Sequence, residues 1–233
     1  MNTRFSDALL KRKQEGFIPV IPDIKRISPK EGELFKGRDP VEVVKLLITA
    51  GAPVLSVVTE KEYFGGSMEL LGRITETFRN IPVLRKDFIT CIDELKTTKD
   101  YGASAVLLIC AIQPFLMIKK LYKEALKTGL EPLVEVHTKE ELMFALEIGA
   151  KLIGINNRNI TKHEKDGGTI STTKVLSRNI PDDVIVISES AIKTPEDAKE
   201  AFTAGVDAIL VGTALWQAEN IGEFYISLSD RLP

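Results

Sequence analysis

The feature that most restricts the fold of this chain is the regular alternation of short apolar runs with longer helical patterns. Eight runs have the length of a strand, and they are apolar throughout rather than at every second residue. Such runs are typical of parallel strands that are covered on both faces. We expect strands at Pro19–Lys25, Val54–Glu60, Val83–Phe88, Ala105–Cys110, Pro132–Val136, Leu152–Asn157, Val184–Ser190 and Ala208–Gly212.

Between these runs, apolar residues recur at three- and four-residue spacing, which predicts amphipathic helices. A further helix, Phe5–Gln14, is expected in a short N-terminal arm, residues 1–18, and the stretches Gly32–Arg38 and Thr161–Ser171 are interpreted as loops. The other predicted helices are Val41–Ala50, Glu69–Phe78, Asp93–Tyr101, Phe115–Lys127, Glu140–Ile148 and Pro195–Ala204.

A weak internal repeat indicates how these units are arranged. Gly51, Gly102, Gly149 and Gly205 each follow a predicted helix, at intervals of about fifty residues. Glycine in this position ends a helix in the left-handed conformation, and fifty residues hold about two strand–helix units. Four pairs make eight units, which favours one α/β domain over residues 1–233, a (β/α)8 TIM barrel, and disfavours a doubly wound sheet.

The composition of the chain disfavours some classes of binding partner. The chain has 31 basic and 33 acidic residues, so no charge excess suits nucleic acid or an anionic membrane. No apolar run approaches the ~20 residues of a membrane span, and we expect a cytoplasmic protein with a small-molecule partner. Helix faces do not reveal oligomeric state, and a monomer or a weak homodimer is expected.

Metal and disulfide chemistry is not expected either. The only cysteines are Cys91 and Cys110, and the only histidines are His137 and His163. Their spacing matches neither a zinc site nor a disulfide framework. His163 lies among charged residues and is interpreted as part of a solvated loop.

Polar residues occur where the predicted strands end. Barrel active sites lie at the C-terminal ends of the strands, and burying charges there without partners would cost several kcal/mol. Convergence of such groups therefore predicts an active site with general acids and bases. Crowded lysines and carboxylates shift one another's pKa values toward neutrality, where they can exchange protons with a substrate. The polar strand ends are Asp23 with Lys25, Arg85-Lys86-Asp87, Glu135, Asn156-Asn157-Arg158 and Ser188-Glu189-Ser190.

The last two strands are followed by a candidate phosphate cradle. Ser190-Ala191 follows the seventh strand, and Gly212-Thr213 follows the eighth. Loops at these two places commonly bind phosphate in barrels through backbone N–H groups and a helix N-terminus.

In these motifs the sequence resembles the indole-3-glycerol-phosphate synthases of tryptophan biosynthesis, from Pro19 onward. The resemblance implies a carboxy-lyase that closes the ring of 1-(2-carboxyphenylamino)-1-deoxyribulose 5-phosphate, a phosphorylated aromatic amino-sugar, with loss of carbon dioxide and water and without a metal or organic cofactor. The matching motifs are Ile24-Lys25-Arg26 with Ser28-Pro29, Ser56–Glu60 with Tyr63-Phe64 and Gly66-Ser67, Arg85–Ile89, Leu133–Val136, Gly154–Arg158, Ser188–Ser190 and Val211–Thr213.

The resemblance also implies roles for single residues. Lys86 would be the general acid at the carbonyl oxygen, Glu135 and Asn156 would contact the hydroxyl and amino region, and Lys25 would hold the carboxylate. Asp23 and Ser190 complete the implied catalytic set. Substrate binding is implied for Ser28, Phe64, Phe88, Leu107, Arg158, Glu189 and Leu210, and phosphate binding for Ser28, Ala191, Gly212 and Thr213, while core packing is a rival interpretation for Leu107.

The sequence departs from the family pattern at several positions. Asp23 replaces the usual glutamate and withdraws a carboxylate by one methylene, Ala191 replaces a usual glycine, and Asn159 replaces a usual aspartate. The N-terminal arm is shorter than is typical, which predicts a reduced lid over the substrate. A displacement near 1 Å can lower a rate by ~100-fold, so Asp23 leaves open whether the family reaction is retained.

Two other functions remain open. The chain could be another phosphosugar-binding barrel enzyme, an isomerase or an aldolase that uses Lys86 or Lys25 as a Schiff-base nucleophile. It could also be a ligand-binding barrel that has lost its activity through the change at Asp23.

Overall fold

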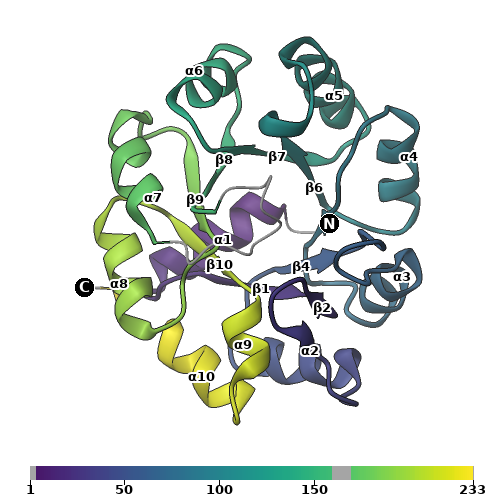
Figure 1. Cartoon of the computed structure of the whole chain (residues 1–233), viewed down its shortest axis with the longest axis vertical. Helices are drawn as coiled ribbons and strands as arrows, with labels where there is room; N and C mark the ends of the chain where they lie inside the picture. The colour runs from purple at the N-terminus through teal and green to yellow at the C-terminus, as the bar shows by residue number, and fades with distance from the viewer. Residues whose placement is uncertain (1–3, 159–168, 233) are drawn as a thin grey trace.

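Eight parallel strands close into a barrel, with helices around its outside (Figure 1). The computed structural model describes residues 4–158 and 169–232, so His163, Asn159 and most of the predicted Thr161–Ser171 loop lie outside the described residues. Strands adjacent in the barrel follow one another along the chain, and β1 pairs with both β4 and β10. The strands are β1 (Val20–Ile24), β4 (Leu55–Val58), β5 (Val83–Lys86), β6 (Ala105–Ile109), β7 (Glu131–Val136), β8 (Leu152–Asn156), β9 (Ile185–Glu189) and β10 (Ala208–Val211).

The predicted (β/α)8 barrel is confirmed, and each predicted apolar run coincides with one strand. The predicted helices agree with the structure to within one residue at each end. These helices are α1 (Phe5–Gln14), α2 (Pro40–Thr49), α3 (Met68–Thr77), α4 (Asp93–Asp100), α5 (Phe115–Lys127), α6 (Lys139–Glu147) and α8 (Pro195–Thr203).

Several short elements were not predicted from sequence. The stretch interpreted as the loop Gly32–Arg38 contains a two-residue strand, β3 (Gly32–Glu33), which forms a small hairpin with β2 (Ile27–Ser28). Short helices escaped prediction because five to eight residues carry little periodicity. They are α7 (Ser171–Leu176), α9 (Thr213–Gln217) and α10 (Ile221–Leu228).

Local sequence explains where the outer helices begin and end. Asp39 caps α2 by accepting a hydrogen bond from the Val41 N–H at 2.9 Å, and Pro40 occupies the first turn. At the other end of α2, Gly51 has a φ of 104°, which reverses the chain toward β4. Gly102, Gly149 and Gly205 also have positive φ, so the predicted repeat of helix-ending glycines is confirmed.

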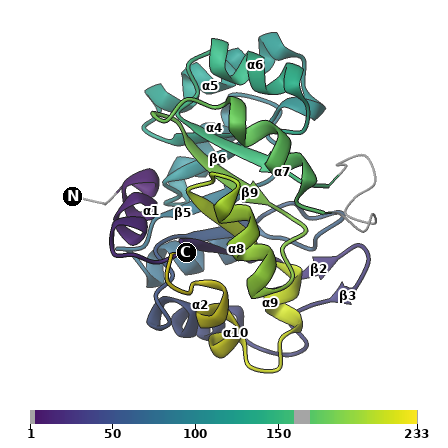
Figure 2. The same ribbon diagram turned by 90° about the vertical axis from the view of Figure 1, so that its left-hand side faces the viewer.

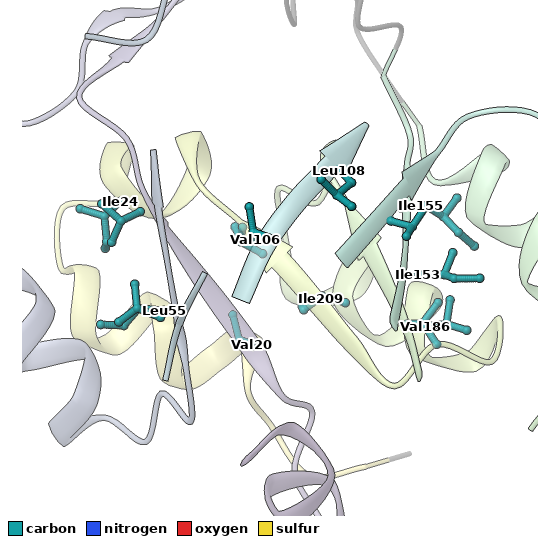
Figure 3. Packing of buried hydrophobic residues seen from close by; sticks show 14 of the residues in the cluster. Val20, Ile24, Leu55, Val106, Leu108, Ile153, Ile155, Val186 and Ile209 are labelled. Carbon is teal, nitrogen blue, oxygen red and sulfur yellow. The ribbon is translucent and has the colours of Figure 1, made fainter. Parts of the chain in front are cut away.

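Two apolar layers lie on the two faces of the strands. The outer layer joins the strands to the helices and includes Val20, Leu55, Val106, Ile153 and Ile209 (Figure 3). The inner layer fills the barrel with Ile21, Leu84, Leu133 and Ile187, among others. Period-two alternation separates the layers, so a strand residue two positions after an inner residue also points inward.

The N-terminal arm closes the end of the barrel at which the strands begin (Figure 2). Phe5 and Leu9 of α1 are fully buried against the inner layer. The Phe5 N–H donates to Glu131 Oε1 at 2.5 Å, and Lys13 pairs with Asp207 at 2.6 Å. Glu131 begins β7 and Asp207 precedes β10, so α1 covers the N-terminal end of the barrel and forms no lid over the opposite end.

None of the helices in the described part of the chain is both long enough and apolar enough to cross a membrane.

Candidate active site

A cleft of about 480 Å³ opens at the C-terminal ends of the strands. Its walls bring together side chains from β1, β5 and β10 and from the loops after β8, β9 and β10. Nine of the residues singled out from sequence line it, namely Asp23, Lys25, Lys86, Arg158, Ser190, Ala191, Leu210, Gly212 and Thr213.

Two buried carboxyl groups interact with the charged residues of this cleft. Glu135 on β7 and Glu189 on β9 are each 1% exposed. Burial raises the pKa of Glu189 well above its ordinary value, and the charges of Glu135 and Asp23 raise it further, against the opposing effect of Lys86. The environment of Glu189 therefore favours its neutral, protonated form over the carboxylate.

Asp23 projects into the barrel from β1 and is 2% exposed. Its Oδ1 accepts a hydrogen bond from Ser56 Oγ at 2.6 Å, and its backbone carbonyl accepts one from the Trp216 indole N–H at 2.9 Å. Ser56 on β4 thus holds the short carboxylate, and Trp216 holds the backbone that carries it. The motif that contains Ser56 was noted from sequence, but this contact was not.

Lys25 and two phenylalanines form an aromatic side of the site. Lys25 Nζ lies 5.5 Å from the centre of the Phe64 ring, and the Phe64 and Phe88 rings are 6.4 Å apart. The Glu60 carboxylate accepts hydrogen bonds from the N–H groups of Tyr63 and Phe64 at 2.8 and 3.0 Å. Glu60 therefore folds the loop that presents Phe64.

Some polar strand-end residues point away from the cleft. Arg85 donates to Thr59 Oγ1 at 3.0 Å, to Thr98 Oγ1 at 2.9 Å and to Asp87 Oδ2 at 2.8 Å. Asn157 donates to Ser188 Oγ at 3.0 Å and accepts from the Thr173 N–H at 3.0 Å. Both residues join a strand to the helix outside it, so alternation leaves only their neighbours Lys86 and Asn156 for the barrel interior.

The loop after β9 has an unusual backbone. Ser190 and Ala191 both have a positive φ, 66° and 62°. The strain predicted for alanine in place of the usual glycine is therefore present at Ala191. Consecutive residues in such conformations can direct their N–H groups toward an anion. This loop lies beside Gly212 and Thr213 in the wall of the cleft.

The remaining predicted residues lie around the cleft. Asn156 ends β8, and its Oδ1 accepts a hydrogen bond from the Arg158 N–H at 3.0 Å. Leu107 is buried in the inner apolar layer, and Phe88 packs against this layer. Ser28 is buried in β2, where its Oγ accepts from the Glu31 N–H at 3.4 Å.

Sequence reasoning missed the position of His137 beside Glu135 and noted this histidine only when excluding a zinc site. His137 follows β7, and its Nε2 lies 3.4 Å from Glu135 Oε1. Its Nδ1 lies 3.3 Å from Glu141 Oε2. The signal available in the sequence was its position two residues after Glu135, which places both on one side of the strand. Lys30 and Lys193, which also line the cleft, were not named either.

No group of three or more histidine, cysteine or acidic side chains within residues 4–158 and 169–232 could hold a metal ion. Cys110 is buried, and burial together with the charges of Glu141 and Glu135 raises the pKa of its thiol to about 12. Cys110 is therefore a neutral neighbour of the site.

Comparison with known proteins identifies the family. A model described as indole-3-glycerol phosphate synthase matches residues 1–228. The chain belongs to this family. The indole-3-glycerol phosphate synthase of Pyrococcus furiosus is 44% identical over 218 residues, which make up 94% of this chain and 93% of that protein. The same enzyme from Pyrococcus abyssi is 43% identical over 87% of each chain. The predicted family is confirmed, and with it the class of decarboxylating lyases in tryptophan biosynthesis.

Solved structures with lower identity share the fold. A 3-hexulose-6-phosphate synthase from Salmonella typhimurium superimposes with a TM-score of 0.74 at 14% identity, over 91% of this chain and 96% of that one. A thiamine phosphate pyrophosphorylase from Pyrococcus furiosus gives a TM-score of 0.66 at 18% identity, over 91% and 93% of the two chains.

Proposed function

We propose that this chain converts 1-(2-carboxyphenylamino)-1-deoxyribulose 5-phosphate into indole-3-glycerol phosphate, carbon dioxide and water. The observation that carries the proposal is the convergence of Asp23, Lys25, Lys86, Glu135 and Glu189 at one end of the barrel, in a chain of the synthase family. Binding pockets of barrels at this end hold small phosphorylated molecules in many unrelated enzymes.

Lys86 is the proposed general acid for ring closure. As the aromatic carbon that bears the carboxylate attacks the ketose carbonyl carbon, the carbonyl oxygen gains negative charge and takes a proton from the Lys86 ammonium. Carbon dioxide then leaves, and the electron pair of the broken bond restores the aromatic ring. A positioned acid of this kind contributes typically 10²- to 10⁴-fold to a rate.

The dehydration is assigned to the other side chains at the mouth. Lys25 holds the substrate carboxylate and then protonates the departing hydroxyl group, which leaves as water. Glu135 removes a proton from the ring methylene carbon beside the amino nitrogen as the carbon–carbon double bond forms, and Asn156 and Ser190 orient the hydroxyl and amino region. Glu189, assigned to substrate binding, belongs to the same polar region.

The ends of the substrate are assigned to the two sides of the site. Phe64, Phe88, Leu107 and Leu210 supply apolar surface for the aromatic ring. The N–H groups of Ala191, Gly212 and Thr213, together with Ser28 and Arg158, bind the phosphate, since backbone N–H groups and an arginine are suited to a dianion. The net reaction involves no change of oxidation state, and the proposal requires no cofactor.

All the proposed residues belong to one chain, and the proposed form of the protein is a cytoplasmic monomer or weak homodimer. The test is the fluorescence of indole-3-glycerol phosphate formed by the purified chain from the carboxyphenylamino substrate. Product formation supports the proposal. If no product forms, and borohydride with a ketose phosphate irreversibly labels a lysine, the chain would instead be a Schiff-base enzyme. If the substrate binds without turnover, the chain would be a ligand-binding barrel.

A further inference from the structure

His137 is held between two carboxylates at the rim of the barrel. Its side chain is 13% exposed, and its Nε2 lies 3.4 Å from Oε1 of Glu135, the proposed base of the dehydration. Among the described residues, neither atom has a hydrogen-bond partner of good geometry. Contacts of this length are common in sites without substrate and shorten when the site closes.

The other side of the imidazole is fixed by α6. Glu141 Oε2 accepts a hydrogen bond from the backbone N–H of His137 at 2.6 Å and lies 3.3 Å from its Nδ1. The N-cap residue Thr138 accepts a hydrogen bond from the Glu141 N–H at 3.2 Å, so Glu141 is itself held in the first turn of the helix. Residues from β7 and α6 therefore orient the ring toward Glu135.

The charges around the ring favour its protonated form. Burial alone lowers the pKa of His137, but the hydrogen bond to Glu141 and the charges of Glu135 and Glu141 outweigh it, and the pKa of His137 is raised. The N-terminus of α6 opposes a positive charge here. The Cys110 thiol is neutral, and Lys86 and Glu189 are not among the groups that shift the pKa of His137.

Deprotonation of the His137 imidazolium would change its interaction with Glu135 from attractive to repulsive. In the protonated ring both nitrogens carry a proton, so Nε2–H is available to donate to the Glu135 carboxylate 3.4 Å away. In the neutral ring the remaining proton stays on Nδ1, because Glu141 accepts from it. The Nε2 lone pair would then face the Glu135 oxygen, and attraction would become repulsion.

We propose that His137 is a positioning residue for the dehydration, which donates a hydrogen bond from Nε2 to Glu135 and holds this carboxylate toward the substrate. The inference rests on the proposed function of Glu135. The proposal predicts that kcat falls when the contact between Nε2 and Glu135 is removed. If His137 were only structural, kcat would instead depend on the contact between Nδ1 and Glu141 of α6.

Two amide variants separate these contacts. The amide nitrogen of glutamine reaches about as far as Nε2, and that of asparagine about as far as Nδ1. We expect His137→Gln to lower kcat only a few-fold, and His137→Asn to lower it roughly 10- to 100-fold with little change in KM, since a displaced catalytic group costs about this much. Equal losses for the two variants, or wild-type kcat in His137→Asn, would overturn the proposal.

The pH profile gives an independent readout. In wild type, kcat should fall on the alkaline side as His137 loses its proton, and this limb should be missing from His137→Gln, whose amide does not titrate. Glu141→Gln should move the limb to lower pH because it removes a charge that favours the imidazolium. Glu140→Gln, an exposed change in the same helical turn, is the matched control and should leave the limb in place.

The experiments test the role of His137 and the proposed synthase function separately. If either His137 variant failed to fold by circular dichroism, the comparison of Glu141→Gln with Glu140→Gln would decide, and an unmoved limb in Glu141→Gln would overturn the role of His137. If wild type formed no indole-3-glycerol phosphate, the proposed function itself would fail. The two failures are therefore distinguishable.

Discussion

Gly154 on β8 leaves the space that the side chain of Glu189 occupies. A β-carbon on Gly154 would lie 1.9 Å from Glu189 Oε1, a distance that non-bonded atoms do not adopt. The two residues lie on neighbouring strands, where Asn156 is paired with Glu189 and Gly154 with Ile187. Glu189 thus leans back into the barrel, across the position of an absent side chain, and this explains how its carboxyl group becomes fully buried.

Gly154→Ala should therefore destabilise the fold by about 1–3 kcal/mol, the usual cost of overpacking. The double variant Gly154→Ala with Glu189→Ala should be more stable than the sum of the two single changes, because the second change removes the colliding group. Urea unfolding of the four proteins measures this coupling. Strictly additive losses would show that Gly154 does not make room for Glu189.

Glu189→Gln should change the dependence of stability on pH. A carboxyl group whose pKa is raised in the folded state contributes stability below its ordinary value of 4.5, and this contribution is lost as pH rises toward the raised value. The glutamine variant should therefore gain stability relative to wild type as pH rises above 4.5, by up to about 1.4 kcal/mol per pH unit, and the advantage should vanish near pH 4.5. The exposed change Glu140→Gln should show no such trend in urea unfolding.

Lys86→Met should abolish most turnover and leave the fold intact. The methionine keeps the apolar stem of the side chain and removes the ammonium group, so the loss should be roughly 10²- to 10⁴-fold in kcat. Activity and thermal unfolding should be measured together, with the exposed Lys120→Met as the control. Turnover close to that of wild type would remove Lys86 from the mechanism.

Ala191→Gly should stabilise the chain because Ala191 has a φ of 62°, in the region where a β-carbon is strained. Relief of about 1–2 kcal/mol per left-handed residue is partly offset by the greater freedom of glycine in the unfolded state, which leaves a gain of up to about 1 kcal/mol. The control is Ala50→Gly, at a helix end where φ is −75° and no strain is relieved. A higher melting temperature in the control than in Ala191→Gly would contradict this account.

The fold was predictable because its signals are local and repeated. Each strand is a continuous apolar run, and helix-ending glycines such as Gly51 recur in register with the strand–helix units. The direction of a single side chain was less accessible. The motif Arg85-Lys86-Asp87 shows three charges, and only the structure separates Lys86 at the cleft from the Arg85–Asp87 pair outside the barrel.

Contacts between distant segments were beyond the sequence. Nothing near Phe5 indicates that α1 would close the N-terminal end of the barrel, because its partner Glu131 is more than a hundred residues away. The pairing of His137 with Glu135 is local, but its meaning depends on Glu141, whose place in the first turn of α6 fixes the ring. Ser56 gained a role only when β4 was found beside β1.

The side chain of Asp23 is one methylene shorter than the usual glutamate, and its surroundings show whether a longer side chain would fit. Ser56 Oγ holds one carboxylate oxygen at 2.6 Å, and the other lies 3.2 Å from the position that a β-carbon on Gly212 would occupy. Glycine at 212 thus leaves space beside the carboxylate, into which a longer side chain could extend.

Asp23→Glu should therefore keep or raise kcat/KM on the carboxyphenylamino-deoxyribulose phosphate, because glutamate restores the usual reach and retains the charge in the same site as Lys25. Asp23→Asn should lower it, because the amide keeps the shape but loses the charge. If the barrel has instead adapted to aspartate, glutamate would overpack the site at a cost of about 1–3 kcal/mol, or roughly 5- to 150-fold in rate. Comparison of the three proteins decides between these outcomes, and equal kcat/KM for all three would mean that Asp23 takes no part in the reaction.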